Sequence, residues 1–483
     1  MNTETQTDQQ IATEIAEAAA RSGISAPHWY DSVDWKRLVE EYPPPPAYFA
    51  STFRWSREQI AAVQLTRLQA QVARAWDTVP FYRRHWEEHG FHPDDLKSLE
   101  DMTRIPQYTV YDIRDSIERR PPFGDYQGFD WDEVAGSVPA RIFFSGGTTG
   151  RSRPTLYTPW DREVGGIISA RALWLQGLRP GYTVINNFAF SLHNAAWIQD
   201  EACARWLGCL PVTASTGNVT STEKQLEIMR DYKVDAVIAF GDYLVHLAAK
   251  ARELGYDPRE DFHVKALAST GSAEAVMEAW GVPALDAYGF HEVQYVSAEV
   301  KPGGGLYVFE DAFIVEVVDT ETGAPLPDGE MGDLVVTCLY KTGSPQIRYN
   351  IKDLSRLYPP VEGLPRTMDH MLGRSDTMVK LRGVNVWPEA IGAVATEDAA
   401  TTGEYFVIAE RHENRDSMTC FVDLHDDADP AAATERIEHA LRSRLMVAVK
   451  VEPLPADELA RLTGLGVEAK LRRFEDRRPR DKR

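Results

Sequence analysis

The stretch 183–240 decides the fold class of this chain. It contains three short apolar runs, which read TVINNFAF at 183–190, CLPVTAS at 209–215 and DAVIAF at 235–240. Two segments with a helical spacing of apolar residues, Asn194–Leu207 and Glu223–Tyr232, separate these runs. Short apolar strands that alternate with amphipathic helices are typical of a sheet covered by helices on both faces. We therefore predict a doubly wound α/β core.

Helical signals dominate the sequence before this core. The leader MNTETQTDQQIATEIAEAAARSG is polar and acidic, and the run Pro43–Pro46 requires an extended segment after it. Ser56 and Gln59 form a capping-box pattern, and apolar residues then recur at helical spacing until Pro80. We predict a mainly helical lead-in over residues 1–130.

The sequence after the core changes character twice. Over residues 303–372, the segments LYVFEDAFIVEVVD, DLVVTCLY and SPQIRYN predict a β-rich subdomain. Beyond Gly373, the strands EYFVIAE, MTCFVDLH and VKVEPL and one amphipathic helix predict an α+β unit of about 110 residues. We expect a large N-terminal domain at 1–372, a hinge at 373–376 and a small C-terminal domain at 377–483.

Charge and composition exclude several classes of protein. Lys and Arg total 52 against 73 Asp and Glu, and the formal charge of −21 argues against a general nucleic-acid or anionic-membrane surface. Four cysteines without a C-x-x-C pair fit a reducing cytoplasm. The sequence has neither a basic, apolar leader nor a run of about 18 apolar residues. We expect a cytoplasmic protein that binds neither nucleic acid nor membrane.

The segment Ser145–Pro154, SGGTTGRSRP, is the most informative motif. Its glycines allow backbone N–H groups to converge on an anion, and its hydroxyl and guanidinium groups add phosphate donors. It differs from a Walker loop, which needs Gly at the position of Ser145 and Lys at that of Arg151. The segment alone leaves two interpretations open, a phosphate cradle and an ordinary Gly/Thr-rich turn.

Further segments contain groups suited to a nucleotide. In Asp286–Glu292, an aromatic ring beside glycine offers a stacking surface, and the carboxylate of Glu292 can hold Mg²⁺ on a phosphate. Carboxylates and arginines recur in Arg348–Asp353, Gly373–Asp376 and Arg382–Pro388, where they suit ribose hydroxyls and phosphate. Buried packing and surface ion pairs at a domain border remain the alternatives.

Taken in order, these segments resemble the AMP-forming acyl-adenylate synthetases and, within them, the phenylacetate-CoA ligase family. The resemblance covers nearly the whole chain from about Leu65. The matching segments are LTRLQAQVARAWDTVPFYRRHWEEHGFHPDDLKSLEDMTRIP, SGGTTGRSRPT, AYGFHEVQYVSAE, LYVFEDAFIVEVVDTETGAPLPDGEMGDLVVT, SPQIRYNIKDL, GRSDTMVKLRGVNVWPEAI and KLRRFEDRR. One such motif is weak, but the whole series in one order is highly specific.

The resemblance implies a role for each matching residue. Catalysis would depend on Thr148, Glu292 and Lys470, with Glu292 holding Mg²⁺ and Lys470 bridging the attacking carboxylate and the α-phosphoryl group. Asp376 would be the hinge residue of a mobile C-terminal domain. The residues implied for nucleotide binding are Ser145, Gly146, Gly147, Thr148, Thr149, Gly150, Arg151, Ser272, Ala273, Glu274, Asp286, Ala287, Tyr288, Gly289, Asp353 and Arg374.

The sequence departs from the family at several of these positions. Arg151-Ser152-Arg153 replaces the usual lysine after the phosphate loop, Ser272 replaces a glycine, and Ala469 precedes Lys470 where glycine is usual. The segment Phe188–Trp197 is bulkier and more polar than the family's glycine-rich stretch, which lines the acid pocket. We expect this pocket at strand ends, with an aromatic acid bearing a polar ring substituent as its substrate. Its expected residues are Phe190, His193, Asn194, Trp197, Phe240, Gly241 and Phe290.

Two histidine signals point to other chemistry. His85-Trp86-Glu87-Glu88-His89 matches the H-x-x-E-H pattern of some zinc peptidases, but a third ligand is not evident, and we favour a helix end before Gly90. His291 could act as a general base beside Glu292. Because the attacking acid is already ionised near neutral pH, we assign His291 to the wall of the site.

The sequence thus predicts a ligase that uses ATP and Mg²⁺ to convert an aromatic or arylalkanoic acid to its adenylate, and then to its coenzyme A thioester. One alternative is an adenylating enzyme whose acyl acceptor is a carrier protein or an amine. An alternative of another class is a regulatory nucleotide-binding module without turnover, although such a module would not need Lys470. A homodimer is compatible with the sequence.

Overall fold

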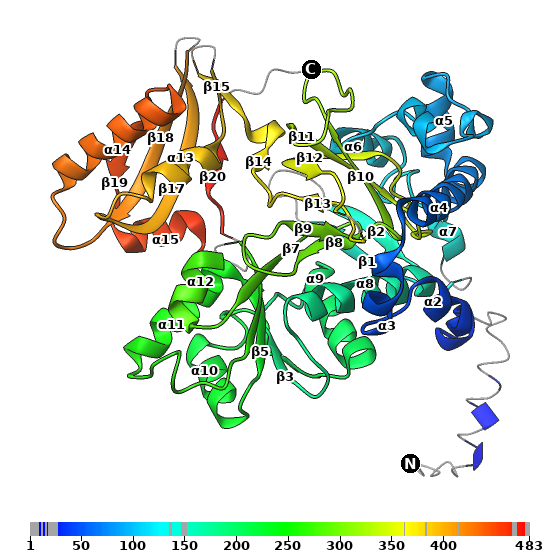
Figure 1. Cartoon of the computed structure of the whole chain (residues 1–483), viewed down its shortest axis with the longest axis horizontal. Coiled ribbons are helices and arrows are strands. Elements are labelled where there is room, and N and C mark those ends of the chain that lie inside the picture. The colour runs from blue at the N-terminus through cyan, green and yellow to red at the C-terminus, as the bar shows by residue number, and fades with distance from the viewer. Residues whose placement is uncertain are drawn as a thin grey trace, which may run out of the picture.

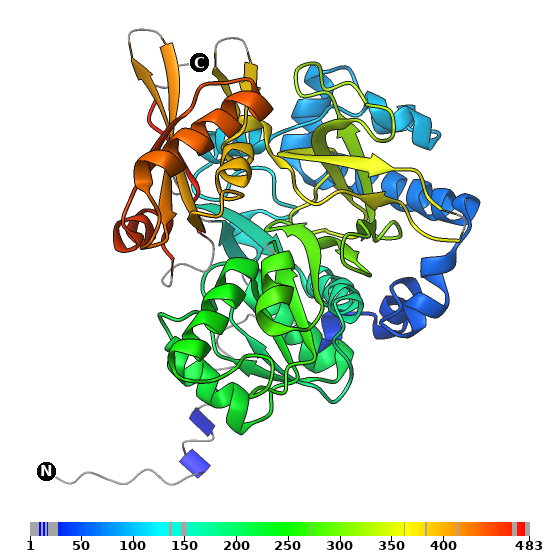
Figure 2. The same ribbon diagram turned by 60° about the vertical axis from the view of Figure 1, so that its left-hand side comes forward.

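The computed structural model describes residues 28–478 except 135–137, 146–151, 272, 362, 382–383, 413–414 and 466–470, and also residues 9, 10, 13, 14 and 17. The chain forms a large unit and a C-terminal unit, coloured orange to red in Figure 1. The C-terminal unit lies above helices α11 (Gly241–Glu253) and α12 (Ala273–Trp280), and a turned view shows the same arrangement (Figures 1 and 2). The predicted α/β fold class is confirmed.

The described part of the lead-in contains helices and no long strand. Ser56 caps α4 in the predicted capping box: its backbone N–H donates to Gln59 Oε1 at 2.9 Å, and its Oγ accepts from the Gln59 N–H at 3.3 Å. Pro80 starts the next helix at its first turn, where a missing N–H costs nothing. The lead-in contains η1 (Tyr30–Ser32), α2 (Trp35–Glu41), α3 (Ala47–Ala50), η2 (Thr52–Arg54), α4 (Arg57–Thr78), α5 (Pro80–Glu88), η3 (Pro93–Asp95), η4 (Leu99–Arg104), α6 (Val110–Arg119) and α7 (Trp131–Val134).

The core is a parallel sheet with helices on both faces. Its strands lie in the order β7-β6-β5-β3-β4, and their bounds are β3 (Thr183–Asn186), β4 (Leu210–Thr213), β5 (Ala236–Phe240), β6 (Ala266–Thr270) and β7 (Ala284–Phe290). Along β5, Val237 packs in a cluster with α10 (Thr222–Asp231), α11 and α12, whereas Ala236 and Ile238 pack on the other side with α8 (Pro159–Leu175). This alternation is the period of two of a strand buried on both faces. A doubly wound core follows.

Two predicted elements differ from their predicted form. The run TVINNFAF is a strand only to Asn186, because Asn186 Oδ1 accepts from the Phe188 N–H at 3.1 Å and Asn187 Nδ2 donates to Gln225 at 2.7 Å. These side chains turn the backbone away from the sheet. The predicted helix Asn194–Leu207 divides into α9 (Ala195–Glu201) and a π-helical turn, η5 (Ala202–Leu207).

The β-rich part continues the same sheet. Among the described residues the sheet has 12 strands, and the antiparallel pair β7–β8 joins its parallel half to its antiparallel half. The antiparallel strands are β8 (Gln294–Glu299), β9 (Leu306–Val308), β10 (Phe313–Val318), β11 (Met331–Cys338), β12 (Tyr349–Tyr358), β13 (Thr367–Met368) and β14 (Gly373–Arg374). A separate hairpin, β1 (Arg141–Ser145) with β2 (Arg153–Tyr157), flanks the phosphate-loop motif.

The C-terminal unit has its own apolar core. Val379, Ile391, Val407, Cys420 and Ile437 are buried together in it. Its sheet has the order β19-β18-β17-β20, with α13 and α14 packed on it. The elements are η6 (Ser375–Thr377), β15 (Val379–Leu381), β16 (Val384–Val386), α13 (Pro388–Ala395), β17 (Thr401–His412), β18 (Arg415–Leu424), α14 (Pro430–Leu445), β19 (Lys450–Pro453), α15 (Ala456–Thr463) and β20 (Phe474–Asp476).

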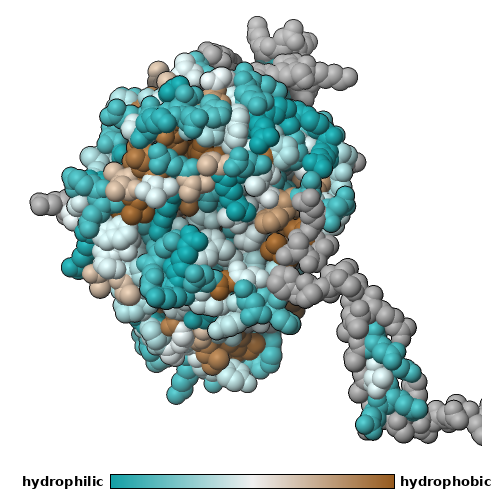
Figure 3. Space-filling view, turned by 90° about the vertical axis from the view of Figure 1, so that its right-hand side faces the viewer, coloured by the Kyte–Doolittle hydropathy of each residue, from teal (hydrophilic) through white to brown (hydrophobic). Residues whose placement is uncertain are grey.

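The exterior is mostly hydrophilic on the face seen in Figure 3, with smaller hydrophobic areas between polar ones. This is the ordinary surface of a folded protein of this composition. No helix in the described part of the chain is both long enough and apolar enough to cross a membrane.

Candidate functional site

The candidate site forms where the two halves of the large sheet meet. The β7–β8 turn holds His291 and Glu292, and the β1–β2 hairpin packs against it, because Tyr157 Oη donates to the His291 carbonyl at 2.7 Å. Phe240 ends β5 and so lies at the carboxyl edge of the parallel strands. Ligands of open α/β sheets bind at this edge. The structure therefore brings the phosphate-loop hairpin and the Glu292 turn to one edge.

Glu292 and Ser145 face the phosphate side of this arrangement. Glu292 is buried, and its Oε1 lies 3.4 Å from Nη2 of Arg153. Ser145 lies opposite Arg153 in the β1–β2 pair, and its buried Oγ has no hydrogen-bond partner among the described residues. A buried hydroxyl without a partner is a polar group available to a ligand. The sequence places Arg153 among the phosphate donors of this segment but does not predict its contact with Glu292.

A hydrogen-bond network surrounds Asp353 on β12. Tyr288 Oη donates to Asp353 Oδ2 at 2.7 Å, and Arg374 Nη1 donates to Asp353 Oδ1 at 2.6 Å. Arg374 also donates to both carboxylate oxygens of Asp376, at 2.8 and 3.0 Å. The structure thus unites four predicted residues, and Arg374 connects the expected ribose carboxylate to the expected hinge.

Asp286 lies in a second charged cluster, which the sequence did not predict. His370 Nδ1 lies 2.8 Å from Asp286 Oδ2, and its Nε2 lies 3.5 Å from Glu299 Oε1. The hydrogen bond to Asp286, followed by that to Glu299, raises the pKa of His370 to about 10. His370 is therefore a cation at neutral pH and holds the Asp286 carboxylate in one orientation.

The remaining described residues that were predicted to bind the nucleotide lie on β7 and at the start of α12. Ala287 is buried on β7, and Gly289 lies at a register shift in the β7–β8 pair. A Cβ at Gly289 would overlap the Gln294 carbonyl, so only glycine fits there. Ala273 and Glu274 begin α12, where Glu274 is exposed in the first turn.

The predicted acid-pocket residues come from two neighbouring strand ends. Phe190 and Phe240 belong to one apolar cluster with Phe188, whose ring centroid lies 4.4 Å from that of Phe240. Trp197 packs edge-on against Phe190 at 5.2 Å. The cluster continues into Gly241, the buried first residue of α11. Flat apolar surfaces therefore gather at this edge.

Polar members of the predicted pocket differ in their environment. His193 is exposed, and its ring lies 6.1 Å from that of His291. Burial lowers the pKa of His291 to about 4, and in the part of the chain that the structure describes its Nε2 has no hydrogen-bond partner. Asn194 is fully buried, and its Oδ1 accepts from the buried Arg162. Phe290 lies 6.0 Å from Tyr349, beside the Asp353 network.

A buried lysine supports the Glu292 turn from beneath. Lys341 Nζ donates to the Glu292 carbonyl and lies 3.8 Å from the ring centroid of Tyr157. Asp161 accepts from the backbone N–H groups of Thr342 and Gly343, both at 2.7 Å, and fixes the segment after Lys341 on α8. Burial lowers the pKa of Lys341 to about 8. The contacts of Asp161 join residues 181 and 182 positions apart, so no local signal could predict them.

Several predicted residues lie outside the described part of the chain. They are Gly146, Gly147, Thr148, Thr149, Gly150 and Arg151 in the phosphate loop, Ser272, and Lys470. Their roles, and those assigned to the residues above, stay predictions. The described residues on either side of the loop, Ser145 and Arg153, are part of the site described here.

The donors present suit Mg²⁺ better than a protein-enclosed metal. No group of three or more His, Cys, Asp and Glu side chains is arranged to hold a metal within the described residues. His85 and His89 of the H-x-x-E-H pattern hydrogen-bond instead to the carbonyls of Gln107 and His85, at 3.0 and 2.7 Å. Mg²⁺ on a nucleotide needs only one or two carboxylates, because phosphates and water complete its shell. Glu292 would supply such a carboxylate.

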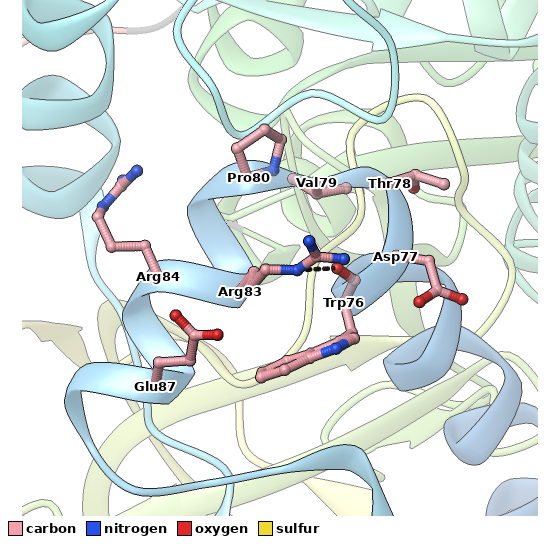
Figure 4. Close-up of a pocket in the computed structure, with 8 residues that line it drawn as sticks. All are labelled: Trp76, Asp77, Thr78, Val79, Pro80, Arg83, Arg84 and Glu87. Atoms are coloured by element: carbon pink, nitrogen blue, oxygen red, sulfur yellow. Dashed lines mark hydrogen bonds between the residues drawn. The ribbon is translucent and has the colours of Figure 1, made fainter.

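A cavity of about 220 Å³ lies in the helical lead-in, at the junction of α4 and α5 (Figure 4). Charges of both signs line it, from Asp77, Arg83, Arg84 and Glu87, and Arg83 Nε donates to the Trp76 carbonyl at 3.1 Å. None of the predicted site residues contributes to it. Its mixed charge and its place in the lead-in separate it from the site at the sheet edge.

Comparison with known proteins places the chain among acid–CoA ligases. Residues 383–478 match the family described as AMP-binding enzyme C-terminal domain. A phenylacetate-coenzyme A ligase of Aromatoleum evansii is 31% identical over 441 residues, which cover 88% of this chain and 96% of the relative. A 2-hydroxyisobutyryl-CoA ligase in the postadenylation state, bound to R3-HIB-AMP, superposes with a TM-score of 0.78 at 27% identity, covering 94% of this chain and 97% of that one. The same ligase in the thioesterification state gives 0.65 at 28% identity, with the same coverage.

Proposed function

This chain belongs to the phenylacetate-coenzyme A ligase family, and from that premise we propose that it activates an aromatic or arylalkanoic acid with ATP and passes the acyl group to coenzyme A. Membership makes the chain an AMP-forming acid–CoA ligase. The identity of the acid, the use of Mg²⁺ and the roles of single residues are the proposal.

The observation that carries the proposal is the Tyr288–Asp353–Arg374 network. Tyr288 and Arg374 each donate to one oxygen of the Asp353 carboxylate and so fix its orientation. Oxygens of an ionised carboxylate can accept both hydroxyls of a ribose. Because the carboxylate is already fixed on both sides, it would bind the nucleotide without losing further freedom.

The phosphate side would be formed by Ser145, Glu292 and Arg153. The unpartnered Ser145 Oγ would donate to a phosphate oxygen, and Arg153 would pair with departing pyrophosphate. Mg²⁺ held by Glu292 would supply charge neutralisation on the phosphates. The acid carboxylate would attack the α-phosphorus in line, while Lys470 would stabilise the charge that builds there.

The acid would bind beside Phe188, Phe190 and Phe240. Their rings offer a flat apolar surface, and Trp197 closes one edge of it. His193 and the unpartnered Nε2 of His291 would contact a polar substituent on the ring. This combination favours a hydroxy-, amino- or heteroaromatic acid over an unsubstituted fatty acid.

The present orientation of the C-terminal unit would be the one in which the enzyme forms the adenylate. The chain resembles the postadenylation form of the related ligase more closely than its thioesterification form, although the coverage is equal. We therefore assign the present orientation to the first half-reaction. A rotation at 373–376 would precede attack by the thiol.

A substrate screen tests the proposal. The purified protein is incubated with ATP, Mg²⁺, coenzyme A and a panel of acids, and thioesters are detected by mass spectrometry. The panel contains phenylacetate, hydroxy- and aminobenzoates, small hydroxy acids such as 2-hydroxyisobutyrate, and fatty acids. We expect the highest kcat/KM with a substituted aromatic acid. A fatty or small hydroxy acid that exceeds every aromatic acid would contradict the aromatic assignment, and adenylate without thioester would favour a carrier-protein or amine acceptor.

A further inference from the structure

Arg473 is fixed within the C-terminal unit by its own sheet. It lies just before β20 and three residues after Lys470 in sequence. Its Nη1 and Nη2 donate to the two carboxylate oxygens of Glu404, at 2.7 and 3.2 Å, and its guanidinium lies 4.9 Å from the ring centroid of Tyr405. Glu404 and Tyr405 both belong to β17. Any movement of the C-terminal unit must therefore carry Arg473 with it.

The same guanidinium contacts the large unit. Nη2 of Arg473 donates to Asp242 Oδ2 at 3.3 Å, and Asp242 lies in the first turn of α11. The two side chains are 18% and 35% exposed, so water screens the pair only in part. Asp242 directly follows Gly241 at the predicted acid pocket. The ion pair therefore connects the segment that follows Lys470 in sequence with the edge of the candidate site.

The contact depends on domain orientation, whereas the Glu404 pair does not. Glu404 and Arg473 move together, but Asp242 stays with α11 when the C-terminal unit turns. Rotation out of the present orientation would have to separate Arg473 from Asp242. The ion pair can form in the present orientation and not in the rotated one, so its interaction free energy favours the present orientation. An equilibrium between two orientations is shifted by such a difference.

We propose that the Asp242–Arg473 ion pair is an interdomain latch that holds the C-terminal domain in the adenylate-forming orientation, so that both are positioning residues for the first half-reaction. This inference rests on the proposed function. The latch speeds adenylation and opposes the turn that admits the thiol. A partly buried ion pair has the strength such a latch needs, since a stronger one would trap the enzyme after adenylation.

The two half-reactions measure the latch. In Asp242→Asn we expect adenylate formation to slow about 2- to 5-fold, whereas thioester formation from synthetic acyl-adenylate stays equal or becomes faster. Arg473→Gln should show the same changes. Adenylate formation in the double variant should be no slower than in the slower of the two single variants. Glu253→Gln, which removes an exposed ion pair from the same helix, is the matched control and should match the unaltered protein. Equal losses in both half-reactions, or additive losses in the double variant, would overturn the proposal.

Domain orientation provides a readout that does not depend on turnover. Spin labels at Val219→Cys and Arg442→Cys, both exposed, report the distance between the two units when Cys209→Ser is included to avoid side labelling. We expect Asp242→Asn, but not Glu253→Gln, to increase the fraction of molecules outside the main peak of the distance distribution about 2- to 5-fold. Identical distance distributions would overturn the latch. If no acid is adenylated even by the unaltered protein, the proposed function is wrong, and these distances still decide on the latch.

Discussion

Arg374 and Asp353 are joined across the β12–β14 pair, where Nη1 of the guanidinium lies 2.6 Å from Oδ1 of the carboxylate. The two residues face each other in register, and Arg374 is the last residue before the turn that contains Asp376. Burial would lower the pKa of Arg374, but the hydrogen bonds to Asp376 and the charge of Asp353 outweigh it and raise that pKa. The expected ribose site and the expected hinge are thus one charged network.

The Tyr288 hydroxyl gives the first prediction. Tyr288→Phe removes the hydroxyl that donates to Asp353 and leaves the ring in place. Because one hydrogen bond contributes about 0.5–1.5 kcal/mol, we expect the KM for ATP to rise about 2- to 12-fold with a smaller change in the KM for the acid. Tyr82→Phe, which also removes a buried hydroxyl but one bonded to Tyr108 and not to Asp353, is the control. A larger effect on the acid than on ATP would contradict the assignment.

The cluster around His370 predicts a pH dependence of stability. The pKa of His370 is about 10 in the folded protein and about 6.5 when unfolded. A raised folded pKa contributes stability that is complete below about pH 6.5 and is lost as the pH approaches 10. We expect His370→Gln to lower Tm most at pH 6 and progressively less towards pH 10, measured by differential scanning fluorimetry. His439→Gln, on the exposed side of α14, is the control. A Tm difference that stays constant with pH would contradict this account of the cluster.

Glu292 gives a prediction about the metal. Glu292→Gln keeps the shape of the side chain but removes the charge that would hold Mg²⁺. We expect adenylation to fall about 10²- to 10³-fold, as is usual when one preorganised electrostatic group is lost at a transition state. The concentration of Mg²⁺ needed for half-maximal rate should rise as well. Glu321→Gln, an exposed acid in a turn, is the control, and an unchanged Mg²⁺ requirement in Glu292→Gln would remove Glu292 from the metal site.

Lys470 separates the two half-reactions. We expect Lys470→Ala to lower the rate of adenylate formation about 10²- to 10³-fold, because the charge on the α-phosphoryl group would then lack its lysine partner. Thioester formation from synthetic acyl-adenylate should be retained much better. Both rates are measured on one preparation of the variant, and Lys233→Ala is the control. Equal losses would show that Lys470 is not the catalytic lysine.

The sequence predicts those elements that depend on residues close to one another along the chain. The apolar run ending at Phe240 predicts β5 because both faces of that strand are buried, and Ser56 with Gln59 predicts the start of α4. The resemblance brought Tyr288, Asp353 and Arg374 together in advance, and the structure adds the bonds between them.

Sequence reasoning did not foresee contacts between distant parts of the chain. His370 meets Asp286 across 84 positions, and Arg473 meets Asp242 across 231. No spacing rule connects such residues, because the sheet topology alone decides which of them become neighbours. The early end of β3 was also missed, since the apolar run continues while Asn186 and Asn187 turn the backbone with their side chains.

The central claim is that this protein forms an acyl-adenylate, and the fate of one carboxyl oxygen of the acid tests it most directly. If the acid carboxylate attacks the α-phosphorus, an acid labelled with ¹⁸O in its carboxyl group carries one labelled oxygen into the acyl-phosphate bridge. Attack of the thiol on the carbonyl then releases AMP that retains this oxygen. We predict that mass spectrometry will find AMP with one ¹⁸O, together with pyrophosphate, for every acid that forms a thioester. Unlabelled AMP, or ADP with phosphate in place of AMP with pyrophosphate, would contradict adenylation by this protein.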